Sequence, residues 1–173
     1  MAGVKNTTAA AAPAPGAQAS GLQAARTLAD GGQLKRAAHQ LQSLLTRERS
    51  PEVLHLWALT QIEQGQRADA EAALLEATQL CPDYVQAHLC LGLLDRPAAQ
   101  RWVSGRHLGV VLRLLEGRAD GDVLPGPEPL QVSMARRLAA VALDDLVRQT
   151  GTAAGGTTDG TAGPVPPRGG GAR

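Results

Sequence analysis

The sequence has few aromatic residues, and this shortage narrows the possible folds. Among its 173 residues there is no phenylalanine, and aromatic side chains make up only 2%. Hydrophobic residues nevertheless reach 43%, and they are chiefly alanine, leucine and valine. Small and unbranched apolar residues favour closely packed helices over a β-sandwich, whose strands prefer β-branched and aromatic residues. The composition therefore predicts an all-α fold.

Cysteine is also scarce, and no constellation of catalytic or metal-binding residues compensates for it. Cys81 and Cys90 are nine residues apart, which fits neither a zinc-ligand pair nor a disulfide framework, so we expect packed, reduced thiols. The four histidines fall in four different predicted helices, with no acid or base at a fixed spacing beside them. The glycine-rich runs lack the preceding strand and the following Lys-Ser/Thr of a phosphate loop. We therefore expect no enzyme, no cofactor and no metal.

Long apolar runs and an excess of one charge are absent as well. No run of 18 apolar residues exists, so we expect no membrane span. The net charge of +1 provides no global attraction to nucleic acid or membranes. The first residues lack the apolar core of a signal peptide, and the first arginine is Arg26. We expect a cytoplasmic protein, with the nucleoplasm as the other possibility, that is neither secreted nor membrane-spanning.

Both ends of the chain and one internal stretch have biased composition. Residues 1–19 are rich in Ala, Pro and Thr, and residues 150–173 in Gly, Thr, Pro and Ala, which predicts disorder in both. Proline, glycine and carboxylates predict a loop at residues 119–129. Residues 130–149 then predict one amphipathic helix. Leu130, Met134, Leu138 and Val141 lie on one side of it, with Ala135, Ala139, Ala142 and Leu146 beside them.

The most informative stretch is residues 51–84, which predicts two helices joined by a turn at Gly65 and closed by Pro82. Residues three or four apart give each helix one packing face. These residues are Leu54, Trp57, Ala58 and Gln61 in the first helix, and Ala70, Leu74 and Ala77 in the second. A hairpin of this size cannot bury its apolar face alone, so neighbours must stack on it.

The same pattern occurs 33 residues earlier, within residues 20–50. Four positions recur at this offset: Gly32 and Gly65, Ala37 and Ala70, Leu41 and Leu74, and Leu44 and Ala77. A capping box starting at Ser20 would begin the first helix, and Ser50 would cap the next unit. A third unit, residues 85–118, is more degenerate, because Pro97 stops its first helix before a second helix expected over about 98–116.

These residues resemble the tetratricopeptide repeat, a 34-residue helix–turn–helix unit. The best unit matches the family's turn glycine, its second-helix alanines and its terminal proline, while Gln61 and Leu74 replace aromatic residues. Leu91-Gly92 matches the Leu-Gly pair of the family's first helix. The resemblance covers residues 20–118, as units 20–50, 51–84 and 85–118. It implies a right-handed superhelical array of about three hairpins, capped by the helix 130–149.

In this family the first helices line a concave groove that holds an extended peptide or a partner helix. The family's groove positions correspond here to Glu52, His55, Leu59, Ile62, Glu63, Gln86, Leu89 and Leu93. The resemblance therefore implies an adaptor or scaffold that binds another protein in a largely aliphatic groove. Chaperone-binding members have Lys and Asn where this chain has His55 and Leu59, which disfavours that role.

Two other functions are open from the sequence. A structural subunit would keep the aliphatic surface covered within a larger complex and would self-associate when alone. An RNA-binding helical-repeat protein would use Arg26, Arg101, Arg106 and Arg113. Basic and acidic side chains number five and two in residues 20–49, one and six in 51–84, and five and two in 85–118. This alternation disfavours a phosphate track and indicates charge complementarity between neighbouring hairpins. The sequence leaves open the oligomeric state and whether the units belong to a longer array.

Overall fold

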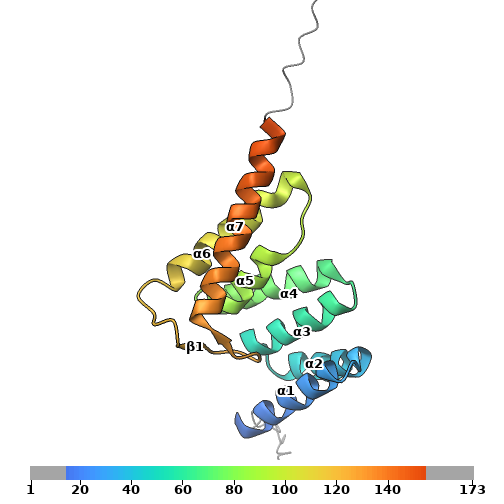
Figure 1. Ribbon diagram of the computed structural model, residues 1–173. Coiled ribbons are helices and arrows are strands. Elements are labelled where there is room, and N and C mark those ends of the chain that lie inside the picture. The colour runs from blue at the N-terminus through green and yellow to red at the C-terminus, as the bar shows by residue number, and fades with distance from the viewer. Residues whose placement is uncertain (1–14, 155–173) are drawn as a thin grey trace, which may run out of the picture.

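A computed structural model describes residues 15–154, with side chains described for residues 19–149. In this range the chain is mostly helical, as predicted; α1 to α4 lie one above another, and the long α7 runs alongside α5 and α6 (Figure 1). They are α1 (Pro15–Asp30), α2 (Leu34–Arg47), α3 (Pro51–Glu63), α4 (Arg67–Leu80), α5 (Val85–Leu93), α6 (Arg101–Leu114) and α7 (Val132–Ala154). A short 3-10 helix, η1 (Ala98–Gln100), precedes α6.

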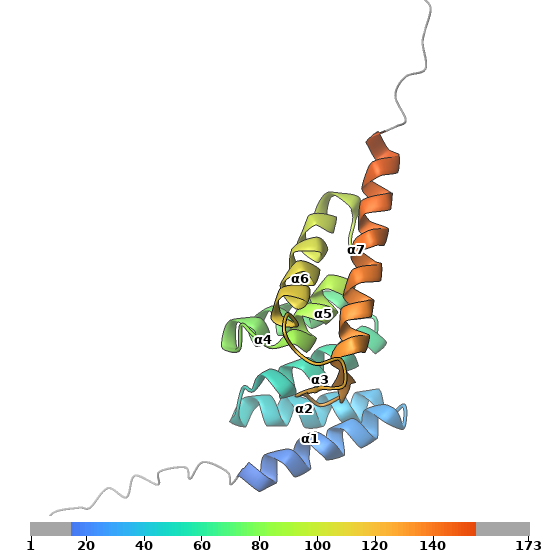
Figure 2. The same cartoon turned by 60° about the vertical axis from the view of Figure 1, so that its left-hand side comes forward.

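Each helix from α1 to α6 packs against the next helix in the chain, and α7 lies against both α5 and α6 (Figure 2). The turns within the first two helix pairs use Gly32 and Gly65, whose φ angles are 71° and 77°. This left-handed conformation costs a residue with a Cβ about 1–2 kcal/mol, so glycine is favoured at both turns. The two glycines that recur 33 residues apart therefore make equivalent turns in two helical hairpins.

Small side chains let neighbouring helices approach closely. Ala58 of α3 and Ala70 and Ala77 of α4 are fully buried in one apolar cluster, together with Leu74. Alanine offers little bulk, so the helix backbones come near enough for the leucines to fill the remaining space. These are the residues that the sequence places on the facing sides of the hairpin.

A second core joins α5, α6 and α7. Gly92 of α5 lies against Leu108 of α6, and a Cβ at position 92 would be 2.5 Å from Leu108 Cδ2. On the other side of this core, Ala135 and Ala139 of α7 are fully buried. The last helix therefore covers the end of the stack with the side that carries Val132, Ala135 and Ala139.

Ion pairs connect the hairpins where the formal charge changes sign. Arg49, which follows α2, pairs with Glu76 of α4. Arg96, which follows α5, pairs with Glu71 of α4 at 2.7 Å, and its guanidinium also donates to Ser104 Oγ at 3.0 Å. The Arg96 side chain is only 4% exposed, so this pair is screened by solvent less than a surface pair. Neighbouring hairpins thus make the complementary contacts that the charge pattern indicates.

Several helix ends differ from those expected. The first helix begins at Pro15 instead of Ser20, so the predicted capping box lies within α1 and does not start it. Proline suits the first position of a helix, because its fixed φ is helical and its missing N–H has no intrahelical partner there. The cap predicted at Ser50 is confirmed, since its Oγ accepts from Val53 N–H at 3.3 Å. The last helix begins at Val132 and continues to Ala154.

The predicted loop at 119–129 contains a strand that the sequence does not reveal. Strand β1 (Val123–Leu124) pairs antiparallel with β2 (Leu130–Gln131), and Val132 N–H donates to Asp122 O at 2.9 Å. These bonds close the base of the loop immediately before α7. The disorder expected for residues 1–19 and 150–173 lies mostly outside the described residues, apart from the ends of α1 and α7.

We predict that Gly92→Ala lowers the free energy of unfolding by about 1–3 kcal/mol, because the new methyl group overlaps the buried Leu108 side chain. Gly109→Ala is the matched control, since no atom lies within 4 Å of a Cβ there. Alanine in that exposed helical position is expected to stabilise the protein by about 1 kcal/mol. Urea unfolding followed by circular dichroism measures both; equal effects of the two substitutions would contradict the close α5–α6 packing.

Candidate partner-binding groove

An apolar groove lies between α3 and α5 on one side and α7 on the other. It encloses a cavity of about 200 Å³, closed at one end by residues 128–130. We call this surface the apolar groove. Its lining residues are His55 and Leu59 from α3, Gln86, Leu89, Cys90 and Leu93 from α5, Glu128, Pro129 and Leu130, and Leu138 from α7.

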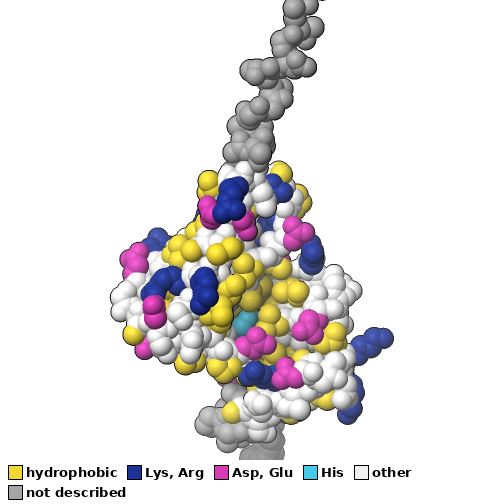
Figure 3. Space-filling view, in the orientation of Figure 1, with side chains coloured by type: hydrophobic (Ala, Val, Ile, Leu, Met, Phe, Trp, Pro, Cys, Tyr) yellow, Lys and Arg dark blue, Asp and Glu magenta, His cyan; other side chains and the backbone are white. Residues whose placement is uncertain are grey.

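Helix α7 widens this apolar surface. Val132, Ala135 and Ala139 face the core, so the larger residues on the other side of the helix are left at the surface. Met134, Leu138 and Val141 are 42%, 38% and 56% exposed, and they follow one another at i, i+4 and i+7. Figure 3 shows the result as a broad hydrophobic area, with a histidine visible within it. An exposed apolar area of this kind is typical of an interaction surface.

The predicted groove residues have different positions in the structure. Five of the eight line the cavity, and three of these, His55, Gln86 and Leu89, are almost fully buried. Leu59 is half-buried and Leu93 is 47% exposed, so these two are accessible to a partner. The other three do not line the cavity; they are Glu52 and Ile62, which are half-buried, and Glu63, which is exposed.

Sequence reasoning missed the contribution of α7 and of residues 128–130. The row of Met134, Leu138 and Val141 was visible as one side of the last helix, but a helix with two apolar sides does not reveal which one it buries. Ala135 and Ala139 take the buried side because their small size allows close contact with α5 and α6. No signal in the sequence placed residues 128–130 at the end of the groove.

His55 forms the floor of the groove and has a partner on each ring nitrogen. Its Nδ1 lies 3.2 Å from the Tyr84 hydroxyl oxygen, and its Nε2 lies 3.3 Å from Cys90 Sγ. Burial lowers the pKa of His55 to about 4 and raises the pKa of Tyr84. Burial, together with the Glu128 carboxylate, raises the pKa of Cys90 to about 12. All three groups are therefore neutral at pH 7.

The Cys90–His55 contact resembles a nucleophile with its base, but its electrostatics oppose that role. A reactive cysteine needs a lowered pKa, which a cationic neighbour or a helix N-terminus provides. Here both groups are shifted towards their uncharged forms. Among the described residues no group of three metal-ligating side chains is placed to hold an ion, and no helix is long and apolar enough to cross a membrane.

A pair of histidines, His88 and His107, links α5 to α6. His88 Nε2 lies 2.9 Å from Pro82 O, an acceptor, so this nitrogen carries a proton. His88 Nδ1 lies 3.0 Å from His107 Nδ1, which makes the neutral His88 the acceptor and His107 the donor. Burial lowers the pKa of both rings, of His107 to about 4. His55 and His88 are 33 residues apart, the offset at which the sequence pattern recurs, yet they have different partners.

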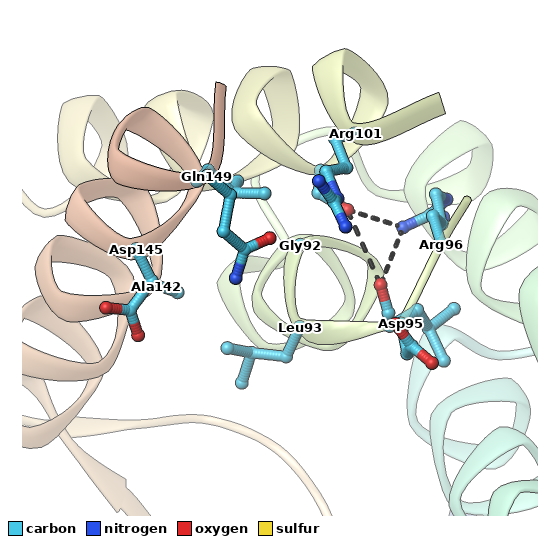
Figure 4. A pocket seen from close by; sticks show the side chains of 11 residues that line it. Gly92, Leu93, Asp95, Arg96, Arg101, Ala142, Asp145 and Gln149 are labelled. Carbon is cyan, nitrogen blue, oxygen red and sulfur yellow. Dashed lines mark hydrogen bonds between the residues drawn. The ribbon is translucent and has the colours of Figure 1, made fainter. Parts of the chain in front are cut away.

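The groove has a polar end. A second hollow of about 230 Å³ shares Leu93 with the apolar groove and continues along α7 to Asp145 and Gln149. Figure 4 shows these α7 side chains facing Arg96 and Arg101 across the hollow. Arg96 is bonded to Leu91 O, Ser104 and Glu71, so its guanidinium is held by the fold. A partner would therefore meet apolar side chains along most of the groove and polar ones at this end.

Stability should depend on pH through His55. Its pKa is about 4 in the folded protein and 6.5 in the unfolded chain, so the unfolded state binds more protons between these values. Stability is therefore full above pH 6.5 and falls as the pH drops towards 4. This residue alone should contribute a loss of about 2 kcal/mol between pH 7.5 and pH 5.

Urea unfolding at the two pH values measures this loss. His55→Gln should reduce the difference between them, although His88 and His107 leave part of it. His39→Gln, on the exposed side of α2, is the control and should keep the full difference. A wild-type protein equally stable at both pH values would contradict the buried, neutral state of His55.

Cys90 should resist alkylation in the folded protein. In a Cys81→Ser background, we expect iodoacetamide at pH 8 to modify Cys90 at least about a hundredfold more slowly than in urea, because the thiolate is scarce at a pKa of about 12. Mass spectrometry of timed samples measures the rate. Modification faster than in the unfolded protein would indicate an activated thiol and a catalytic role.

No protein-family model, curated protein or solved structure matches this chain.

Proposed function

We propose that this protein is an adaptor that binds a helix of another protein in the apolar groove. The observation that carries the proposal is the set of accessible apolar side chains on both sides of it, Leu59 and Leu93 opposite Leu138. An amphipathic helix recognises such a surface through residues at i, i+3, i+4 and i+7. The row of Met134, Leu138 and Val141 provides the matching spacing on the receptor.

The resemblance to tetratricopeptide repeats supports the same proposal. Under this proposal, the helix pairs α1–α2, α3–α4 and α5–α6 form a right-handed array of three repeats, and α7 caps that array. The groove would then lie on the side of α3 and α5, the first helices of their pairs, where members of that family bind partners. We place the protein in the cytoplasm or nucleoplasm, where such adaptors act on other soluble proteins.

The exposed apolar area also favours a second candidate, a permanent subunit of a larger complex. A subunit would self-associate or aggregate when alone, whereas an adaptor with an intermittent partner stays monomeric at micromolar concentration. RNA binding has less support, because two of its four candidate arginines have partners within the fold. Arg26 pairs with Asp30, and the Arg106 guanidinium lies 5.7 Å from the centre of the Trp102 ring.

A photo-crosslinking amino acid at position 138 should label a partner in cell extract, because Leu138 lines the groove. The same amino acid at position 80 is the control, since Leu80 is 51% exposed on α4 and does not line the cavity. Leu59→Asp/Leu93→Asp should reduce the labelling at least tenfold, because a carboxylate in the apolar contact must be desolvated.

Leu75→Asp/Leu80→Asp, two exposed leucines of α4, should leave the labelling unchanged. Circular dichroism checks that both double variants are folded. Equal labelling in the two double variants, or labelling at position 80 alone, would refute the groove as the binding site.

A further inference from the structure

The segment Pro125–Pro129, which we call the strap, covers one end of the groove as a bound peptide would. Its base is the β1–β2 pair beside α7, and its tip reaches α1. Gln86 Nε2 of α5 donates to Glu128 O at 2.7 Å, and Arg26 of α1 donates to Pro127 O. Side chains from α1 and α5 thus hold successive backbone carbonyls of a bent, proline-rich segment.

The contacts of the strap explain which of its residues matter. Gly126 has a φ of 154°, and a Cβ there would lie 2.8 Å from the Tyr84 hydroxyl and would overlap Gln86 Oε1. Pro127, the next residue, is buried, whereas Glu128 is exposed. The site therefore requires glycine at position 126, buries the proline that follows it, and leaves the side chain after that exposed.

The strap satisfies only one of the two hydrogen-bonding atoms of the Gln86 side chain. Gln86 is 3% exposed, and its Oε1 has no hydrogen-bond partner among the described residues, although its Nε2 is bonded to the strap. A buried acceptor without a donor is unfavourable, and release of the strap would return it to water. The free energy gained by hydrating this oxygen offsets part of the free energy lost when the strap contacts break. The strap is therefore suited to exchange.

The sequence contains one other Gly-Pro dipeptide. Gly126-Pro127-Glu128-Pro129 is matched by the segment 163–166, Gly-Pro-Val-Pro, which lies outside the described residues. In the strap, Glu128 lines the apolar groove near His55. Valine at that place would set an apolar side chain against the groove in place of a carboxylate.

Geometry decides which copy of this segment can reach the strap site. The strap adjoins the start of α7, and the 23 residues of that helix extend about 34 Å away from it. From Ala154 to Gly163 the chain makes nine residue steps, which span at most about 32 Å when fully extended. The segment 163–166 therefore falls short of the strap site of its own chain, but it can reach that of a second copy.

We propose that the strap is an exchangeable intramolecular ligand, and that the segment 163–166 of a second copy binds in its place. This proposal concerns the strap site and stands whether or not a partner helix binds in the groove. The resident strap has the advantage of high effective concentration. Exchange in the unaltered protein is therefore weak, and it becomes measurable when the strap is removed.

Two variants open the site in different ways. In the first, residues 125–129 are replaced by Gly-Ser-Gly-Ser-Gly; in the second, Gly126→Ala disrupts the fit of the strap against Gln86 and Tyr84. The probe is a fluorescein-labelled peptide with the sequence of residues 160–169. We expect fluorescence anisotropy to show binding to both variants at least tenfold tighter than to the wild type. The same peptide with Gly163→Ala should bind at least tenfold more weakly.

Sedimentation velocity provides the second readout. The strap-replaced full chain should self-associate, and the same variant ending at residue 154 should remain monomeric. Absence of peptide binding by folded variants overturns the proposal, as does equal binding of the Gly163→Ala peptide. If a peptide with the sequence of residues 122–131 binds and the 160–169 peptide does not, the segment 163–166 is not the ligand of the strap site, and the proposal is overturned. If both variants unfold, the strap is a structural element and the proposal is wrong.

Discussion

Close approach between helices is the constraint on which the rest of this structure depends. With 2% aromatic residues the chain has few bulky side chains to fill wide spaces between helices. Burial is achieved instead by alanine and glycine at the contacts, with leucines between them, as at Ala70, Leu74 and Gly92. Each helix pair still leaves an apolar side open, so the pairs must lie against one another, and the last pair needs α7. A larger residue at one of these contacts would separate two helices and expose both.

The same constraint accounts for the candidate site. Because α7 packs through the side that carries Val132, Ala135 and Ala139, the residues Met134, Leu138 and Val141 face outwards. They extend the apolar side chains of α3 and α5 into one surface. The proposed binding surface thus lies where packing through small residues leaves large apolar side chains exposed. The strap limits this surface at one end, and the hollow near Asp145 limits it at the other.

Among the described residues, the buried polar groups are neutral or paired, with one exception. Arg96 is almost buried, but it has Glu71 and two further acceptors. The buried histidines are held uncharged by desolvation, and each has a hydrogen-bond partner. The exception is Gln86 Oε1, and it lies where the strap meets α5. An unsatisfied atom at a segment boundary marks a contact that is easier to exchange than the rest.

The sequence by itself determined the helical content, the turns at Gly32 and Gly65, the cap at Ser50 and the pairing of basic with acidic hairpins. These follow from local chemistry: periodicity, left-handed glycine and formal charge act within a few residues or between chain neighbours. Through a family resemblance it also predicted Leu59 and Leu93 as groove residues, and both line the cavity. Only the tertiary structure decided which side of α7 is buried, that the strap reaches α1, and that His55 meets Cys90 and Tyr84. Those contacts join residues about 30 to 100 positions apart, and competition between two apolar helix sides is resolved by fit against neighbours, which no local pattern records.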